Sequence, residues 1–144
     1  MLKLLKLISI GLLGIFLTSG AFAKTEVVYI PKNTGNPYFD SIIKGFEVGA
    51  EKYGYNFSTV APATADATSQ LPFIKAEIQR GVDVIAISPN SNDALNTVFD
   101  QARKKGIIIM VVNGDIPGSE AHRDIAIMPV DFSTVGTAQM TLMG

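Results

Sequence analysis

The fold is decided by the stretch Gly81-Val82-Asp83-Val84-Ile85-Ala86-Ile87-Ser88-Pro89. Its nearly continuous apolar run is typical of a parallel strand that is covered on both faces. The glycine before the run suits the left-handed residue that ends a helix, and Arg80 places a cation at the negative end of that helix. The stretch therefore predicts a helix, a glycine turn and a buried strand, in that order.

The same unit occurs three times. Gly54 and Gly106 also follow polar or cationic residues and precede apolar runs, and the three glycines are 27 and 25 residues apart, the length of one helix plus one strand. Parallel strands joined by right-handed crossovers form an open sheet with helices on both faces. We therefore expect an α/β fold with a doubly wound parallel sheet. The expected strands are Val27–Ile30, Tyr55–Val60, Val82–Ser88, Ile107–Val112 and Ile125–Val130.

Apolar residues at helical spacing predict the helices between these strands. The middle helix has the weakest stripe, and Pro72 must lie in its first turn, which favours a start near Thr68 or Ser69. A last helix is expected to begin near Ser133. The stripe of the first helix consists of Phe39, Ile42, Ile43, Phe46, Ala50 and Tyr53, and that of the helix after the third strand of Leu95, Val98, Phe99 and Ala102.

Residues 1–23 have the three-part layout of a secretory signal peptide. Lys3 and Lys6 precede an apolar run from Leu7 to Leu17, and Ala21-Phe22-Ala23 has the small-x-small pattern of a cleavage site. The run is short for a membrane span, which needs about 20 residues. We expect export and cleavage after Ala23. An uncleaved N-terminal anchor is the alternative, and both place the protein outside the cytoplasm.

The composition of residues 24–144 excludes several classes of function. These 121 residues carry a net charge of −3, whereas a nucleic-acid partner requires a basic face. The chain has no cysteine, so it has neither disulfides nor a lipid-modified cysteine, and we expect a protein free in the periplasm. No phosphate-binding glycine motif, zinc-ligand cluster or catalytic triad occurs, so no cofactor, metal or catalytic residue is expected. The single histidine, His122, is expected to be a solvated loop residue.

Ligands of open α/β sheets bind beyond the carboxyl ends of the strands. The segments expected there are residues 31–39, 61–66, 88–93, 113–117 and a turn near Asp131. Their side chains suit a sugar, because an aromatic face packs on the C–H face of a sugar ring while polar groups bond its hydroxyls. The candidate ligand-binding residues are Tyr38 and Phe39 for stacking and Lys32, Asn36, Asn113 and Asp115 for the hydroxyls.

Each candidate also has a structural explanation. Asn36 is a suitable helix cap before Pro37, and Phe39 falls on the apolar stripe of the first helix. Lys32 reads equally as a solvated loop cation, and Asn113-Gly114-Asp115 as a turn. Tyr38 lies off the stripe, so its ring is freer to face a ligand.

Four blocks, in order, resemble the bacterial periplasmic sugar-binding proteins of ABC importers, in the ribose, rhamnose and autoinducer-2 branch. The blocks are Asn36-Pro37-Tyr38-Phe39, the strand from Gly81 to Pro89, Asn92-Asp93-Ala94 and Asn113-Gly114-Asp115. The resemblance implies a type I periplasmic binding protein fold, in which two α/β lobes close on one sugar.

The resemblance also implies roles for the candidate residues. Asn36, Tyr38 and Phe39 would supply the amide and stacking groups of the first lobe. Ile30-Pro31-Lys32 is similar to the rhamnose and autoinducer-2 binders, in which the lysine contacts ligand oxygens. Asn113 stands where many members carry an aspartate that bonds sugar hydroxyls. The implied partners are a small sugar or sugar-like ligand and an inner-membrane ABC permease, with no nucleic acid and with a monomer at full length.

The resemblance predicts a truncated chain. Residues 24–130 would form the N-terminal lobe, and residues 131–144 the start of the crossover into a second lobe that the sequence lacks. The expected function is non-enzymatic capture of a monosaccharide-like ligand for import, with an autoinducer-2 or rhamnose binding protein as the alternative. An exported α/β enzyme and a repressor-type ligand-sensing domain are alternatives of another class. The repressor would need a DNA-binding helix-turn-helix where the signal peptide stands.

The signal peptide can be tested directly. Expression of the full chain in a bacterium is expected to give a periplasmic product whose N-terminal residue is Lys24, because cleavage follows Ala23. Intact-mass spectrometry of the periplasmic fraction measures this. A product that retains residues 1–23 in the membrane fraction would instead support the uncleaved anchor.

Overall fold

Five parallel strands form one sheet, in the order β2-β1-β3-β4-β5, in the computed structural model. The model describes residues 23–91, 93–115, 118–128 and 132–143, so the predicted signal peptide lies outside it except for Ala23. The predicted strands are confirmed. The first begins one residue earlier than predicted, the other four are shorter, and the last ends three residues before Val130, which is itself not described. The strands are β1 Glu26–Ile30, β2 Asn56–Thr59, β3 Val84–Ile87, β4 Ile108–Val112 and β5 Ile125–Ile127.

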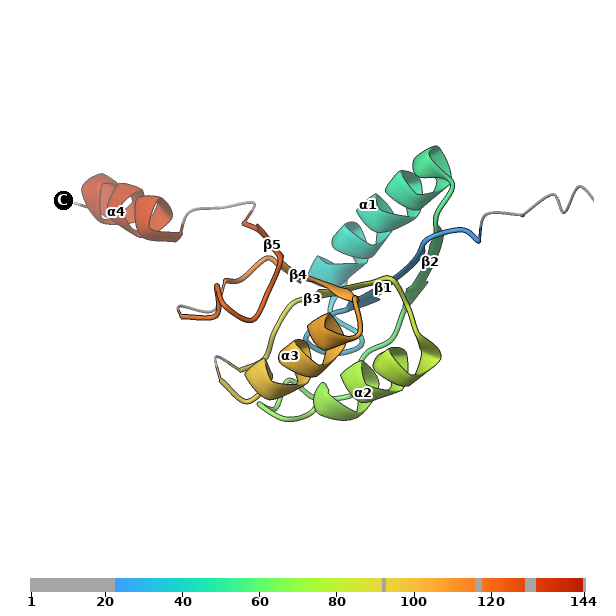
Figure 1. The fold of residues 1–144 in the computed structure, drawn as a ribbon. Coiled ribbons are helices and arrows are strands. Elements are labelled where there is room, and N and C mark those ends of the chain that lie inside the picture. Colours follow the sequence, from blue (N-terminus) through green and yellow to red (C-terminus); the bar gives the residue numbers. More distant parts are fainter. Residues whose placement is uncertain (1–22, 92, 116–117, 129–131, 144) are drawn as a thin grey trace, which may run out of the picture.

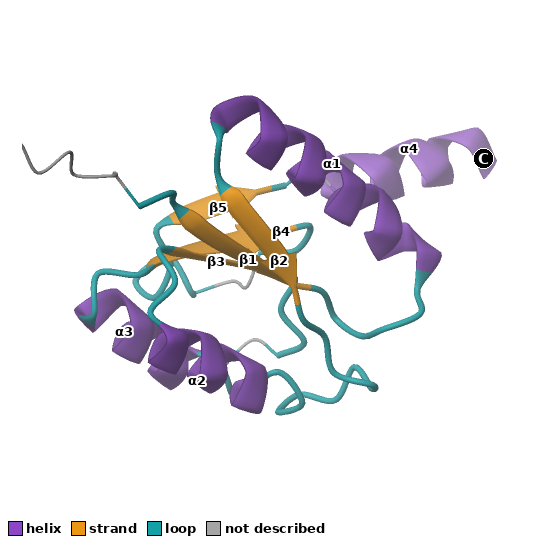
Figure 2. Cartoon of the chain, turned by 90° about the vertical axis from the view of Figure 1, so that its right-hand side faces the viewer, coloured by secondary structure: helices purple, strands orange, loops and turns teal. Residues whose placement is uncertain are grey.

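Helices cover the sheet from both sides. Helix α1 (Pro37–Tyr53) packs on one face, and α2 (Leu71–Arg80) and α3 (Asn96–Lys104) pack on the other (Figure 1, Figure 2). This arrangement confirms the doubly wound α/β fold. Helix α4 (Phe132–Met143) stands apart from the sheet (Figure 1). It occupies the segment in which a crossover to a second lobe was predicted.

The glycine turns behave as the repeated unit predicts. Gly54 ends α1 with φ of 73° and Gly81 ends α2 with φ of 76°, both left-handed, where glycine carries no steric penalty. Lys105 ends α3, and Gly106 follows with φ of 83°.

The predicted start of α2 was too early. Helix α2 begins at Leu71 instead of Thr68 or Ser69, although Pro72 does lie in its first turn. Helix α3 begins at Asn96, because a separate turn precedes it, in which Ser91 Oγ accepts a hydrogen bond from the Ala94 amide at 3.1 Å. The polar residues before α2 and α3 thus close turns and do not cap these two helices.

The main core lies between the sheet and the pair α2 and α3. Alternate strand residues point to this face, as the two-residue period of a strand requires. Val28, Ile85 and Ile109 from three neighbouring strands are completely buried, and so are Phe99 of α3 and Ile74 of α2. The three central strands are therefore fully covered on this face.

The opposite face is covered only in part. Tyr29 and Ala86 are buried under α1, but Ile108 of β4 keeps 41% of its surface exposed. Tyr53, which the sequence places on the apolar stripe of α1, is 63% exposed. One helix is too narrow to cover five strands. Among the described residues, no helix has the length and apolar character to cross a membrane.

The two faces predict different costs for neighbouring substitutions in β4. Ile109→Ala removes a completely buried side chain and is expected to lower the free energy of unfolding by about 2–5 kcal/mol. Ile108→Ala is expected to cost about 1 kcal/mol or less, because its side chain already contacts water. Urea unfolding followed by circular dichroism measures both. Equal losses would show that the α1 face is covered in solution.

Candidate functional site

The carboxyl ends of three neighbouring strands are held together by one hydroxyl. Ser88, just after β3, lies 2.8 Å from the Tyr29 hydroxyl, and its Oγ donates to the Val112 carbonyl oxygen at 2.9 Å. Because the Ser88 proton goes to Val112, the Tyr29 hydroxyl donates to Ser88. The sequence indicates for Ser88 only that it ends the third strand. In the structure, Ser88 also fixes the sheet edge from which the candidate residues project.

A buried glutamine joins the loops beyond this edge. Gln70 is fully buried, and its Nε2 donates to the carbonyl oxygens of Pro31 at 3.0 Å and Ser88 at 2.9 Å. Its Oε1 accepts a hydrogen bond from the backbone amide of Asn90 at 2.9 Å. Asn90 in turn donates from Nδ2 to the Lys32 carbonyl oxygen at 2.8 Å. Sequence reasoning missed Gln70 and Asn90, since nothing local distinguishes them from solvated amides.

Tyr38 and Asn113 are brought together. They lie 75 residues apart, and the exposed Tyr38 hydroxyl donates a hydrogen bond to Asn113 Oδ1. The Tyr38 ring packs edge-on against Phe39, with centroids 5.3 Å apart. Asn113 has φ of 62°, a left-handed conformation that asparagine tolerates better than most residues. Asn113 thus bends the chain after β4 and presents its amide at the carboxyl edge of the sheet, which is called the rim below.

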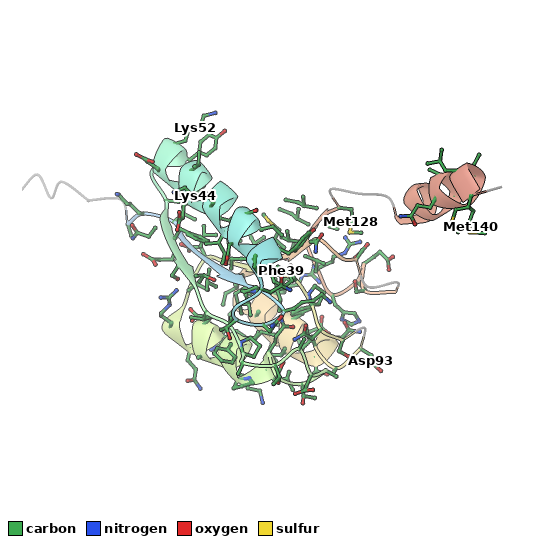
Figure 3. The ribbon with its side chains drawn as sticks, turned by 180° about the vertical axis from the view of Figure 1, so that it is seen from behind. Phe39, Lys44, Lys52, Asp93, Met128 and Met140 are labelled. Carbon is green, nitrogen blue, oxygen red and sulfur yellow. The ribbon has the colours of Figure 1, made fainter. Side chains whose placement is uncertain are left out.

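Asn36 and Phe39 fill the structural roles that the sequence left open. Asn36 Oδ1 accepts from the Tyr38 amide at 3.1 Å and so caps α1. Phe39 is buried, at the end of α1 nearest the rim, in a cluster with Tyr29 and Ala86 (Figure 3). These two residues therefore fix the direction of α1 and, through it, the position of Tyr38.

Lys32 and Asp115 are engaged with protein partners. The half-buried Lys32 donates from Nζ to the Pro89 carbonyl oxygen at 2.8 Å. Arg123 holds Asp115 through two hydrogen bonds of 2.8 and 2.6 Å, a bidentate geometry that raises the pKa of Arg123. Sequence reasoning did not single out Arg123. The negative charge of Asp115 is thereby neutralised at the base of its loop.

His122 lies in a loop, as expected, but its side chain is partly buried and bonded to α3. Its Nδ1 lies 2.9 Å from Asp100 Oδ1 of α3, so the ring ties its loop to that helix. Among the described residues, no three histidine or acidic side chains gather closely enough to hold a metal ion. The small cavity nearest the rim, of about 230 Å³, lies between the ends of β1 and β2 and includes Asn36 and Phe39.

The chain, with its polar loops at the carboxyl edge of a doubly wound sheet, is similar to known proteins. Residues 27–144 match the family model described as periplasmic binding protein domain. The chain belongs to this family. It is 25% identical over 126 residues to the ribose import binding protein of Escherichia coli (strain K12) and 32% identical over 109 residues to the D-allose-binding periplasmic protein of the same organism.

The family match is supported by solved structures. A solute-binding protein of an ABC transporter from Clostridium phytofermentas, with bound L-rhamnose, superposes with a TM-score of 0.77 at 26% identity, covering 84% of this chain and 37% of that one. The ribose and allose relatives cover 88% and 75% of this chain. The chain spans only 42% and 35% of their lengths. It therefore corresponds to less than half of a relative.

The bond between Tyr29 and Ser88 predicts an alkaline instability. Burial raises the pKa of Tyr29 to about 12. The folded state thus holds the phenol proton more tightly than the unfolded chain, whose tyrosine has a pKa of about 10. Stability is expected to be complete below pH 10 and to fall by about 2–3 kcal/mol as the pH rises through 12.

Urea unfolding between pH 8 and pH 12 measures this fall. In Tyr29→Phe it is expected to be reduced, after a constant loss of about 1 kcal/mol at pH 8 for the missing hydrogen bond. Tyr53→Phe, at an exposed tyrosine far from the edge, is the matched control and should follow the unmodified chain. An unchanged fall in Tyr29→Phe would show that another group is responsible.

Proposed function

We propose that this chain is the first lobe of a periplasmic solute-binding protein that captures a monosaccharide-like ligand. The ligand would be passed unchanged to an inner-membrane ABC permease. The observation that supports this most is the pairing of Tyr38 with Asn113 at the carboxyl edge, in a chain of the periplasmic binding protein family. An aromatic face beside an amide is a suitable surface for a sugar.

The chemistry of the rim suits hydroxyl groups. The exposed Tyr38 ring offers an apolar face to the C–H side of a sugar, and the Asn113 amide both donates and accepts. Lys32 adds a cation that only donates, and its present acceptor is a neutral carbonyl oxygen, which a ligand oxygen can replace. These groups favour a neutral polyol and do not favour an anion, because Lys32 is the one cation of the candidate set.

The ligand class follows from the relatives only in outline. The two curated relatives are named for ribose and allose, and the superposed protein holds L-rhamnose. We propose a sugar of this kind. A rhamnose or autoinducer-2 binder is the second candidate, and Ile30-Pro31-Lys32 favours it, since Lys32 lies at the rim.

The proposed protein is exported, works in the periplasm after removal of residues 1–23, and is monomeric at full length. It is not an enzyme and needs no cofactor, because binding and release change no bond of the ligand. Asn36, Phe39 and Asp115 belong to the proposed ligand-binding set as well. For them we propose contact with ligand in addition to the cap, core and ion-pair roles described above. No observation favours the exported enzyme or the repressor-type sensor.

A single lobe is expected to bind sugar poorly, because the cleft that excludes water needs both lobes. Isothermal titration of this chain with ribose, allose and rhamnose should show no binding of micromolar or better affinity. In nuclear magnetic resonance titrations at millimolar sugar, amide shifts of Tyr38 and Asn113 are expected, and Asn113→Ala should remove them. Val48→Ala, on the exposed side of α1, is the control. Micromolar binding by this chain would contradict the two-lobe proposal, and shifts elsewhere would contradict the proposed rim.

A further inference from the structure

Asn113 is followed by Gly114, and this is the one Asn-Gly pair in the sequence. In such a pair the backbone nitrogen of the glycine can attack the side-chain amide carbon of the asparagine, because the glycine has no side chain to hinder the approach. The pair lies directly after β4, and both residues are half-buried. The amide group of Asn113 therefore stands beside a nucleophile of its own chain.

The attacking nitrogen is not held by the fold. Among the residues that the structure describes, none accepts a hydrogen bond from the backbone N–H of Gly114. The N–H of Asn113, by contrast, donates to the Ile127 carbonyl oxygen at 2.9 Å. Arg123 holds Asp115 through its two hydrogen bonds of 2.8 and 2.6 Å. The N–H of Gly114 can thus turn toward the Asn113 side chain without losing a hydrogen bond, while the residues on either side of it stay fixed.

The attacked carbonyl group already has a donor. The Tyr38 hydroxyl donates a hydrogen bond to Asn113 Oδ1. When the Gly114 nitrogen adds to Cγ, negative charge develops on this oxygen, and a donor that is already aimed at it stabilises that charge. The Nδ2 group, which must leave, has no acceptor within the described part of the chain. Tyr38 therefore promotes the addition, and no hydrogen bond of the fold retains the leaving group.

We propose that Asn113 deamidates spontaneously in the folded chain and that the Tyr38 hydroxyl accelerates this reaction. The Gly114 nitrogen loses its proton and bonds to Asn113 Cγ, the Cγ–Nδ2 bond breaks, and Nδ2 leaves as ammonia with that proton. The product of this step is a cyclic imide. Water then opens the imide at either of its carbonyl carbons and gives aspartate or isoaspartate, so the reaction consumes only water.

Two other asparagines at the same edge of the sheet lack this combination. Pro37 follows Asn36, and a proline has no N–H with which to attack. Asn90 donates from Nδ2 to the Lys32 carbonyl oxygen at 2.8 Å and to Ser69 Oγ at 3.2 Å, so the fold retains its amide group. Both asparagines are therefore internal references within the same chain.

The aspartate product fits the same place. Asparagine and aspartate both tolerate the left-handed backbone, and Asn113 has φ of 62°. A carboxylate oxygen accepts the hydrogen bond of Tyr38 as the amide oxygen does. The rim would gain a negative charge and lose the two donors of the amide, so deamidation would change what the rim can bind. Deamidation itself does not depend on the proposed sugar binding.

Mass spectrometry of peptides from the full chain measures the reaction. The form that accumulates on expression is purified, incubated at neutral pH over several weeks and digested, and the conversion of each asparagine is followed. Asn113 is expected to convert at least tenfold faster than Asn36 or Asn90. Gly114→Ala should slow this conversion at least tenfold. The fold tolerates the change, since Gly114 has no positive φ and an added Cβ would meet nothing within 4 Å.

Tyr38→Phe isolates the contribution of the hydroxyl. In the folded chain this variant is expected to deamidate at least threefold more slowly, with circular dichroism showing that it folds. Tyr53→Phe, at an exposed tyrosine, is the matched control and should keep the rate of the unmodified chain. In urea, where Tyr38 no longer lies beside Asn113, Tyr38→Phe should have no effect. Equal conversion of all asparagines, or a folded Tyr38→Phe variant that reacts as fast as the unmodified chain or faster, would overturn the proposal.

Discussion

The constraint on which this structure depends is that a parallel sheet must be covered on both faces. Helices α2 and α3 satisfy it on one side, where Val28, Ile85 and Ile109 of the three central strands are completely buried. Helix α1 satisfies it on the other side only in part, so Ile108 of β4 and Ile125 and Ile127 of β5 stay exposed. The exposure of Tyr53 follows from this uneven cover. In a relative of full length, additional chain is available for the same surface.

The local sequence pattern was sufficient to predict the strands and helices. It was insufficient to predict which residues contact each other between them. The apolar runs and the glycines at 54 and 81 predicted five strands and two helix ends, because period and backbone conformation are properties of neighbouring residues. The early start predicted for α2 was wrong because the polar residues before it form a turn and do not cap the helix. Tyr53 is exposed because α1 is the one described helix on its side of the sheet. The apolar stripe of α1 cannot show how many helices share that side.

In the candidate site too, some residues could be predicted from the sequence and others could not. The rule that ligands lie beyond the carboxyl ends of strands brought Tyr38 and Asn113 to one rim although they are 75 residues apart. The roles of Ser88 and Gln70, which hold that rim, could not be predicted from the sequence. A buried hydroxyl or amide and a solvated one can have the same neighbours in the sequence. Their role exists only once Tyr29, Pro31 and Val112 have been brought beside them.

The polar groups of the rim already bond one another. Asn113 accepts from Tyr38, Arg123 holds Asp115, and Lys32 donates to a carbonyl oxygen. A sugar hydroxyl would therefore exchange one hydrogen bond for another, and such an exchange contributes only about 1 kcal/mol per bond. Affinity must then come mainly from removing the ring and these groups from water, because a hydrogen bond is stronger where water cannot compete. An open edge cannot do this. A second lobe that closes over the rim can, which explains why a lobe with a correct rim is expected to bind sugar so weakly.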